Sequence, residues 1–536
     1  MRPFISLLLV ELLASGLFLS PAPAVAQSLG TTTPIQHLVV IFQENISFDH
    51  YFGTYPNALN TTGEPQFTPL AATPTVNGLT NALMTRNPNF LNSKNGTGMV
   101  NPFRLDRSQA ATTDQNHNYG PEQAAFHAGM MDLFPANTGT AGPPPVAALD
   151  ETQTATTGIN MGYYDGNTVT ALWNYAQRFA MNDNSYGTNF GPSTTGALNL
   201  ISGQTNGVVG NINGTGSVIA DGNGGMTDIG DADPVGDVCS TTTGEAFSMT
   251  GTTIGDLLNT AGVSWGFFTQ GFDLTITNAN GTTGCARSTT SAVTATNKAD
   301  YIPHHEPFQY YKSTANPTHA RPASKAVIGT AADKAANHQY DVHDFYDAIL
   351  AGNYPAVSFL KAPGYQDGHA GYSDPLDEQA FIVTVVNFLQ QNADWEHTAV
   401  VIAYDDSDGW YDHQMGPIVN QSTTTADALT GTGACGTGGS SLAGVTAANA
   451  QGRCGYGPRL PLLVISPWSR QNFVDHTVTD QTSVIRFVED NWLNGERIGN
   501  GSFDSIANSI ANMFDFEKAN TKKYILDPNS GLVTQK

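Results

Sequence analysis

The stretch that decides the fold is Ala399-Val-Val-Ile-Ala-Tyr-Asp-Asp-Ser-Asp-Gly-Trp-Tyr-Asp-His413. It opens with an apolar run, Ala399 to Tyr404, that has the length and composition of a buried strand, and Asp405 and Asp406 follow the run directly. Adjacent carboxylates repel each other and are costly to bury unless a cation compensates them. In open α/β sheets, ligands bind beyond the carboxyl ends of strands. The stretch therefore indicates a metal site, with an acidic turn closed by Gly409 as the alternative.

A second apolar run of strand character covers residues 37–43 and delivers Glu44 and Asn45 at its end. Carboxylate and amide oxygens are the hard donors that suit divalent cations. The alternative is a capping turn, in which Asn45 or Ser47 caps a helix that begins near Phe48.

Apolar runs and periodic segments alternate along the rest of the chain. We expect further strands at residues 263–269, 356–361 and 459–466, and helices at residues 122–134, 169–180, 197–201, 253–262, 341–351, 376–392 and 481–491. Residues 57–112, 204–252 and 420–453 are rich in Gly, Asn, Thr and similar residues and are predicted to be loops. This rhythm predicts an α/β fold, a three-layer α/β/α sandwich with a mostly parallel sheet and long loop insertions. We expect residues 27–536 to form a single catalytic domain.

The turn Gly191-Pro192 places Ser193 near the start of a predicted helix. A hydroxyl in this position can simply cap the helix. It can also be a nucleophile, since the helix amides and dipole would hold an anion such as phosphate. The residues themselves leave both alternatives open.

Four histidines lie in predicted loops: His117, the adjacent His304 and His305, and His369 after the strand at 356–361. Each one alone is an ordinary loop residue. Polar groups that follow several strands of one sheet, however, are what a shared active site predicts.

The first 26 residues are typical of a secretory signal peptide, with Arg2, an apolar run and the small residues Ala24-Val-Ala26. Glu11 interrupts the run, and an uncleaved anchor is the alternative. No later stretch is apolar for long enough to span a bilayer. We therefore expect a secreted or periplasmic protein that has no integral membrane segment after signal cleavage.

The net charge of −24 argues against nucleic-acid binding, but it leaves a negatively charged substrate possible because a local metal reverses the field in a pocket. Four cysteines follow the predicted cleavage site, and export favours their oxidation. Of the three possible pairings, we prefer Cys239–Cys285 with Cys435–Cys454, in which each disulfide closes a loop.

Taken together, these motifs resemble the bacterial phosphoesterase family, which joins phosphatidylcholine-type phospholipases C with acid phosphatase A on an alkaline-phosphatase-like α/β/α fold. The matching motifs follow the family's order: Glu44-Asn45-x-Ser-Phe-Asp-His-Tyr-Phe-Gly53, Phe190-Gly-Pro-Ser193, His304-His305, Tyr404-Asp-Asp-Ser-Asp-Gly-Trp-Tyr-Asp-His413, Arg459-x-Pro461 and Ser466-Pro467. Two positions depart from it, because Ile46 stands where many members have Arg and Ala370 where Pro is common.

The resemblance implies a serine nucleophile, a phosphoserine intermediate and one divalent metal ion, which could be calcium, magnesium, manganese or zinc. The implied metal ligands are Glu44, Asn45, Ser193, Asp405 and Asp406, and Ser193 is also the nucleophile. The resemblance further implies that His117, His304, His305 and His369 surround the phosphate. In such a site we expect His305 or His369 to protonate the leaving oxygen.

The substrate is expected to be a small phosphate ester or a phospholipid headgroup. Phospholipases of the family usually carry extra β-rich domains, whereas this chain ends soon after Trp492. We therefore expect acid-phosphatase-like hydrolysis of phosphomonoesters. The alternatives are a phospholipase C acting on phosphatidylcholine-type phosphodiesters and, less favoured, a catalytically inactive binding protein on the same fold.

Overall fold

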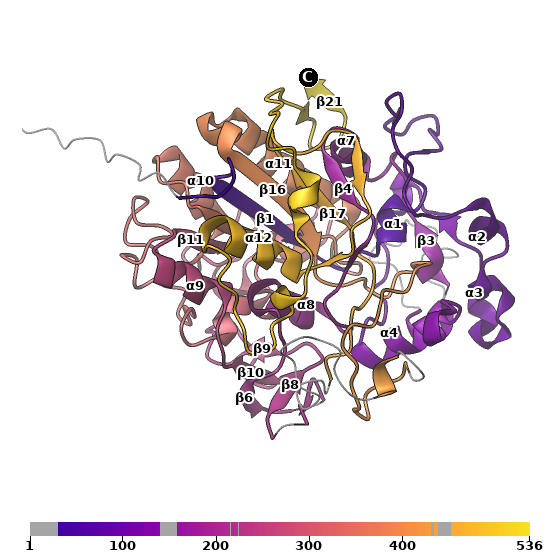
Figure 1. Cartoon of the computed structure of the whole chain (residues 1–536), viewed down its shortest axis with the longest axis horizontal. Coiled ribbons are helices and arrows are strands. Elements are labelled where there is room, and N and C mark those ends of the chain that lie inside the picture. The colour runs from indigo at the N-terminus through magenta and orange to yellow at the C-terminus, as the bar shows by residue number, and fades with distance from the viewer. Residues whose placement is uncertain are drawn as a thin grey trace, which may run out of the picture.

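The computed structural model describes residues 30–139, 158–214, 216–222, 224–429, 434–437 and 452–535. The predicted signal peptide lies outside these residues, as does much of the predicted loop at 420–453. At the centre is an eight-stranded sheet of order β14-β11-β15-β1-β16-β17-β4-β18 (Figure 1). In that order, the strands are Gln339–Tyr340, Trp265–Thr269, Val357–Lys361, His37–Gln43, Thr398–Tyr404, Leu462–Ile465, Ala180–Asn182 and Phe473–Asp475.

The predicted, mostly parallel sheet is confirmed. Only β17 runs against its neighbours β16 and β4, and all other adjacent pairs are parallel. The central strand β1 pairs with β15 on one side and β16 on the other, and its last residue, Gln43, lies opposite Tyr404. Because the two strands end at the same level, the polar residues that follow them leave the sheet side by side.

Alternate residues of the central strands face two separate hydrophobic cores. Val39 and Ile41 pack in one core with α7, α10 and α11, whereas Val40 and Phe42 pack in the other with α8, α9 and α12. These six helices are Thr170–Ala176, Val342–Leu350, Pro375–Gln391, Ser193–Ser202, Ile254–Ala261 and Thr482–Trp492. Helices thus cover both faces of the sheet, and the three-layer α/β/α sandwich is confirmed.

Several predicted boundaries are wrong. The helix expected at 122–134 is split, because α4 (Tyr119–Phe126) ends where His127 and Ala128 adopt positive φ and α5 (Phe134–Asn137) starts later. The helix expected at 169–180 stops at Ala176, since the chain turns there into β4.

The segment 204–252, expected to be a loop, holds short strands. They are β6 (Val208–Ile212), β7 (Val218–Ala220), β8 (Met226–Asp228), β9 (Asp233–Pro234) and β10 (Ala246–Met249). The segment 57–112 likewise holds α2 (Asn81–Thr85), α3 (Pro88–Leu91) and β2 (Phe103–Arg104). The remaining short elements are α1 (Phe48–Phe52), β3 (Gly162–Tyr163), β5 (Ser185–Tyr186), β12 (Ser288–Thr290), β13 (Asn297–Ala299), β19 (Thr479–Asp480), β20 (Ile525–Leu526) and β21 (Val533–Gln535).

Both preferred disulfides, Cys239–Cys285 and Cys435–Cys454, are present. Among the described residues, no helix combines the length and the apolar character needed to cross a membrane.

Candidate active site

Ser193 is the first residue of α8, directly after the turn Gly191-Pro192. Gly191 has φ of 118°, a conformation that glycine adopts without strain. The N-cap position is held by Pro192, so Ser193 does not cap the helix and that alternative is wrong. Instead, a carboxylate oxygen of Asp231 accepts hydrogen bonds from the backbone N–H and the hydroxyl of Thr194, both at 2.9 Å. The Ser193 hydroxyl is therefore left to point elsewhere.

Gly196 allows α8 to pack directly on the end of β16. A Cβ atom at this position would lie 2.2 Å from the backbone oxygen of Asp405. This close approach brings the first turn of α8, and Ser193 with it, over the pair Asp405 and Asp406.

Three oxygen atoms from two different strand ends converge on the Ser193 hydroxyl. Ser193 Oγ lies 2.9 Å from Glu44 Oε2, 3.2 Å from Asp406 Oδ2 and 3.3 Å from Asn45 Oδ1. A hydroxyl carries one proton and can satisfy only one of these acceptors. The arrangement thus concentrates acceptors and negative charge around one oxygen atom.

Asp405 connects the ends of β1 and β16. Its Oδ1 accepts hydrogen bonds from the backbone N–H of Asn45 at 2.9 Å and of Asp406 at 2.7 Å. Its Oδ2 is buried and has no hydrogen-bond partner among the described residues. Burial, followed by repulsion from Asp405, raises the pKa of Asp406 well above its ordinary value.

This donor set fits a hard divalent cation. Carboxylate, amide and hydroxyl oxygens converge, Asp405 Oδ2 lacks a partner, and a cation would offset the repulsion between the carboxylates. Calcium, magnesium and manganese prefer such oxygen ligands. The residues Glu44, Asn45, Ser193, Asp405 and Asp406 thus have the chemistry of a site for a hard divalent cation, and their role as ligands stays a prediction.

In the described chain, three groups of His, Cys, Asp or Glu offer ligand atoms within 4.8 Å of one another, and none of them includes Glu44, Asp405 or Asp406. Two of these groups have other partners. Cys239 of one group is in a disulfide, and Asp49 and Asp412 of another form ion pairs with Arg459. The third adjoins Ser193 and consists of Asp114, His117, His369 and Asp408.

His117 is oriented by its own loop and by Asp408. Its Nδ1 lies 2.9 Å from the backbone oxygen of Gln115 and 3.1 Å from Asp408 Oδ1, so Nδ1 carries a proton. Its Nε2 lies on the other side, 3.5 Å from the side-chain nitrogen of Asn45. Burial alone would lower the pKa of His117, but Asp406 and Asp408 outweigh it and raise that pKa well above its ordinary value.

The other three histidines complete the ring around the cluster. His305 Nδ1 lies 3.3 Å from Glu44 Oε1, and the rings of His304 and His305 meet edge to face with centroids 4.5 Å apart. The ring of His369 lies 5.7 Å from that of His117. Burial lowers the pKa of His305 well below its ordinary value and that of His369 to about 4. Burial also opposes protonation of His304, but Asp233 and Asp231 raise its pKa.

Lys361 was missed by the sequence analysis. It is the last residue of β15, is 1% exposed, and its Nζ forms an ion pair with Glu44 Oε1. Nothing in the local sequence links the two residues, which lie 317 positions apart.

Glu122 of α4 was missed as well. It is buried, and its carboxylate accepts hydrogen bonds from the Gly191 N–H at 3.1 Å and the Ser407 hydroxyl at 2.8 Å. Burial raises the pKa of Glu122 to about 7. Glu122 thus ties the turn before Ser193 to the turn after Asp406.

A groove of about 310 Å³ runs beside the turn before Ser193. Its lining residues are Asn118, Tyr119, Gly120, Gly216, Ser217, Ile229 and Gly230. Two contacts connect the groove to Gly191. Glu122 of α4, the helix that forms one wall, accepts a hydrogen bond from the Gly191 N–H. On the other wall, the backbone oxygen of Ile229 lies 3.3 Å from the position that a Cβ on Gly191 would take. The groove therefore adjoins the Ser193 cluster, and none of the described residues that line it is charged.

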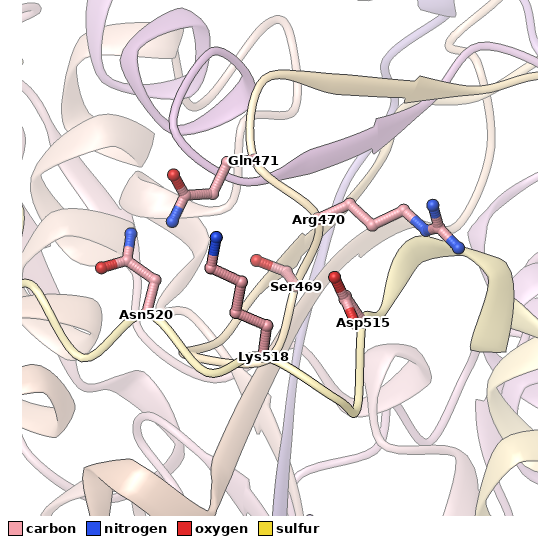
Figure 2. A pocket seen from close by; sticks show the side chains of 6 residues that line it. All are labelled: Ser469, Arg470, Gln471, Asp515, Lys518 and Asn520. Atoms are coloured by element: carbon pink, nitrogen blue, oxygen red, sulfur yellow. The ribbon is translucent and has the colours of Figure 1, made fainter.

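A second surface cavity, of about 200 Å³, is separate from this cluster. It is lined by residues after β17, among them Ser469, and by Asp515, Lys518 and Asn520. Because β17 is antiparallel to its neighbours β16 and β4, the residues that follow it lie toward the other end of the strands from Ser193. Figure 2 shows Lys518 extending toward Gln471, with Asn520 on one side and Ser469 on the other, while Arg470 points away.

Comparison with known proteins identifies the family. The phosphoesterase family matches residues 35–493, which include every residue of the Ser193 cluster. The chain belongs to the phosphoesterase family. The resemblance found in the sequence motifs is therefore confirmed.

Similar proteins with curated descriptions include a non-hemolytic phospholipase C of Burkholderia pseudomallei, 28% identical over 86% of this chain and 55% of that protein. Others are a non-hemolytic phospholipase C of Pseudomonas aeruginosa, 26% identical over 86% of this chain and 54% of that one, and phospholipase C A of Mycobacterium tuberculosis, 24% identical over 86% and 73%. The chain spans about half the length of the first two. A solved structure from the alkaline phosphatase superfamily of Vibrio parahaemolyticus covers 61% of this chain and 60% of its own, at 11% identity and a TM-score of 0.27, which is too low to support an argument.

All predicted site residues thus lie in one cluster, although their roles are still predictions. The predicted ligand residues and Ser193 are joined by hydrogen bonds, and the four histidines surround them. The sequence analysis missed six further residues in or beside this cluster, which are Asp114, Glu122, Asp231, Asp233, Lys361 and Asp408.

Proposed function

We propose that the protein is a metal-dependent phosphoric ester hydrolase that uses Ser193 as its nucleophile. The observation that carries the proposal is the convergence of Glu44, Asn45 and Asp406 oxygens on the Ser193 hydroxyl. Membership of the phosphoesterase family supports the hydrolysis of a phosphoric ester.

A serine hydroxyl is a weak nucleophile at neutral pH. When bound to Glu44, Asn45, Ser193, Asp405 and Asp406, a divalent cation would supply Lewis acidity and favour the ionised hydroxyl. Ser193 Oγ then attacks phosphorus, a phosphoserine forms, and the alcohol leaves. Water hydrolyses the phosphoserine in the second half of the reaction.

The departing oxygen needs one proton, and we assign that role to His117. Asp408 and the Gln115 carbonyl fix its ring, so that Nε2 faces the cluster. His117 also immediately precedes Asn118, the first residue that lines the groove. The part of the substrate that fills this groove would lie next to His117. This geometry favours His117 over His305, whose Nδ1 faces Glu44.

For the substrate, we propose a phosphodiester of the phospholipid type. The expectation of a monoesterase depended on where the chain ends, whereas the three curated relatives described above are phospholipases C. The groove of about 310 Å³ is at the lower end of the usual range for ligand pockets, about 300–1,000 Å³. It suits the headgroup alcohol, which in a phospholipase C reaction stays on phosphorus while diacylglycerol is the alcohol that leaves.

We further propose that the protein is exported. The two disulfides support this, because disulfides persist in oxidising compartments. Cell fractionation of a strain expressing the full chain tests the proposal, and the predicted leader should be absent from the exported product.

The deciding experiment compares wild type and Ser193→Ala on phosphatidylcholine and on an aryl phosphate monoester, with and without a chelator. We expect wild type to prefer the diester, and both the substitution and the chelator to lower turnover by at least 10³-fold, because each removes the activated nucleophile. Ser324→Ala, at an exposed serine, is the matched control.

A preference for the monoester would restore the acid-phosphatase expectation and reject the diester proposal. Full activity of Ser193→Ala on both substrates would reject the nucleophile and the mechanism built on it. Activity that survives exhaustive chelation would reject the metal.

A further inference from the structure

The charge on the predicted ligands exceeds what one divalent cation can neutralise. Glu44, Asp405 and Asp406 carry three negative charges when ionised, and Asn45 and the Ser193 hydroxyl are neutral. A single divalent ion therefore leaves one negative charge over, before the nucleophile itself loses its proton. In a buried site such an excess is costly unless another cation lies close by.

Lys361 supplies that cation from inside the protein. It is 1% exposed and extends from the end of β15, next to β1, with its Nζ 5.4 Å from the centre of the Phe42 ring. The only ion pair of Lys361 among the described residues is with Glu44 Oε1. The other oxygen of the same carboxylate, Oε2, lies 2.9 Å from Ser193 Oγ.

The two oxygens of Glu44 are thus assigned to different partners. Oε1 faces Lys361 and, at 3.3 Å, His305 Nδ1, while Oε2 faces Ser193. With Oε1 occupied, Glu44 can give only Oε2 to a cation beside Ser193. Burial keeps the Lys361 ammonium away from solvent, and its ion pair with Glu44 holds it beside the Ser193 cluster.

We propose that Lys361 is a positioning residue, which holds Glu44 to one-oxygen coordination and balances the charge of the metal site. The proposal rests on the proposed function, since it assumes a metal beside Ser193. It also predicts that the affinity for a divalent cation rises, and does not fall, when Lys361 is replaced by a neutral residue. Removing a positive charge so close to the site strengthens the attraction for a divalent cation, while the freed Glu44 carboxylate turns away from Ser193.

The test measures Mn²⁺ binding by calorimetry to metal-free wild type, Lys361→Met and Lys361→Arg. We expect Lys361→Met to bind Mn²⁺ at least about tenfold more tightly than wild type, from the lost repulsion. Its kcat on the preferred phosphate ester should fall at least tenfold. Lys361→Arg keeps the charge, and its Mn²⁺ affinity should stay within about threefold of wild type.

A second readout is the melting temperature without and with saturating Mn²⁺. Lys361→Met leaves Glu44 buried without its cation, so Mn²⁺ should raise the melting temperature more in this variant than in wild type. A variant that folds only in the presence of Mn²⁺ supports the proposal for the same reason.

A purely structural role predicts the reverse, with weaker Mn²⁺ binding and a lower melting temperature both without and with metal. That result would overturn the proposal, as would a Lys361→Met variant that fails to fold even with Mn²⁺. Wild type that binds no divalent metal at all would instead reject the proposed metal site, so the two failures are distinguishable.

Discussion

At the residue scale, Gly196 sets how closely α8 approaches the end of β16. We predict that Gly196→Ala lowers kcat about 100-fold, because its Cβ, otherwise 2.2 Å from the Asp405 backbone oxygen, must push Ser193 away from its partners. Overpacking costs about 1–3 kcal/mol of folding free energy, and the better helix propensity of alanine offsets up to about 1 kcal/mol of it. Steady-state kinetics and urea unfolding measure both effects.

The control for this substitution is Gly30→Ala, since a Cβ at Gly30 meets no atom within 4 Å. Its kinetics and stability should match wild type. Unchanged kcat in Gly196→Ala would show that the register of α8 against β16 does not set the position of the nucleophile.

Single residues were predictable from the sequence when a motif carried them. Asp405 and Asp406 stand out because carboxylates at the end of an apolar strand need an explanation. Lys361 does not stand out, since a lysine at a strand end is ordinary until the fold places it beside Glu44, 317 positions away. Asp408 was similarly hidden in what resembled an acidic turn.

At the element scale, the first turn of α4 forms one wall of the groove beside Ser193. Asn118 is exposed and makes no capping hydrogen bond, so Asn118→Trp should leave the fold intact while filling the groove. We predict a fall of at least tenfold in kcat/KM for phosphatidylcholine and less than twofold for methyl phosphate. The ratio of the two values is the measurement.

Leu350→Trp provides the matched control, because Leu350 is 72% exposed at the end of α10, a helix that does not line the groove. If Asn118→Trp lowered kcat/KM equally for both substrates, the substitution would be acting on the nucleophile and not on the groove. If kcat/KM fell for neither substrate, the headgroup alcohol would not occupy the groove.

Elements were predictable where the hydrophobic pattern is long. β1 has the predicted bounds and β16 differs by one residue, because a buried parallel strand is a continuous apolar run. The strands β4, β14 and β18 have only two or three residues, too few to show a period. The predicted helix at 122–134 failed because His127, Ala128 and Gly129 all adopt positive φ, and only Gly129 is a residue type that commonly does so.

At the scale of the whole molecule, stability should depend on pH through Asp341. Burial alone would raise the pKa of Asp341, but His343 and Arg287 outweigh it and lower that pKa to about 2, against an ordinary value of 3.8. A depressed pKa means that the carboxylate stabilises the fold above pH 4, and that this contribution disappears as the pH falls toward 2. The difference corresponds to about 2 kcal/mol.

We therefore predict that Asp341→Asn lowers the free energy of unfolding by about 2 kcal/mol at pH 7, and that the gap to wild type shrinks to about half by pH 3. Urea unfolding of both proteins from pH 7 to pH 3 measures this. Asp347→Asn, on the same helix but at a carboxylate 35% exposed, is the control. A gap that is constant with pH would mean that Asp341 acts through packing alone.

The topology was predictable only in outline. Alternation of strands and helices predicts a mostly parallel sheet, but nothing local distinguishes β17, which runs the other way. The strand order and the pairing of β1 with β15 and β16 depend on contacts between distant parts of the chain, which a single sequence does not reveal.

The connection of β1 to β16 also has a consequence for the timing of synthesis. Asn45 and Asp405 are hydrogen-bonded although 360 positions separate them, and Asp406 follows Ser193 by 213. At ribosomal rates of about 5–20 residues per second, Ser193 is synthesised roughly 10–40 seconds before Asp406, the last of the predicted metal ligands. Throughout that interval the nascent chain has an inert hydroxyl. The order of the segments thus keeps the proposed metal-ligand set incomplete until Asp406 has been synthesised.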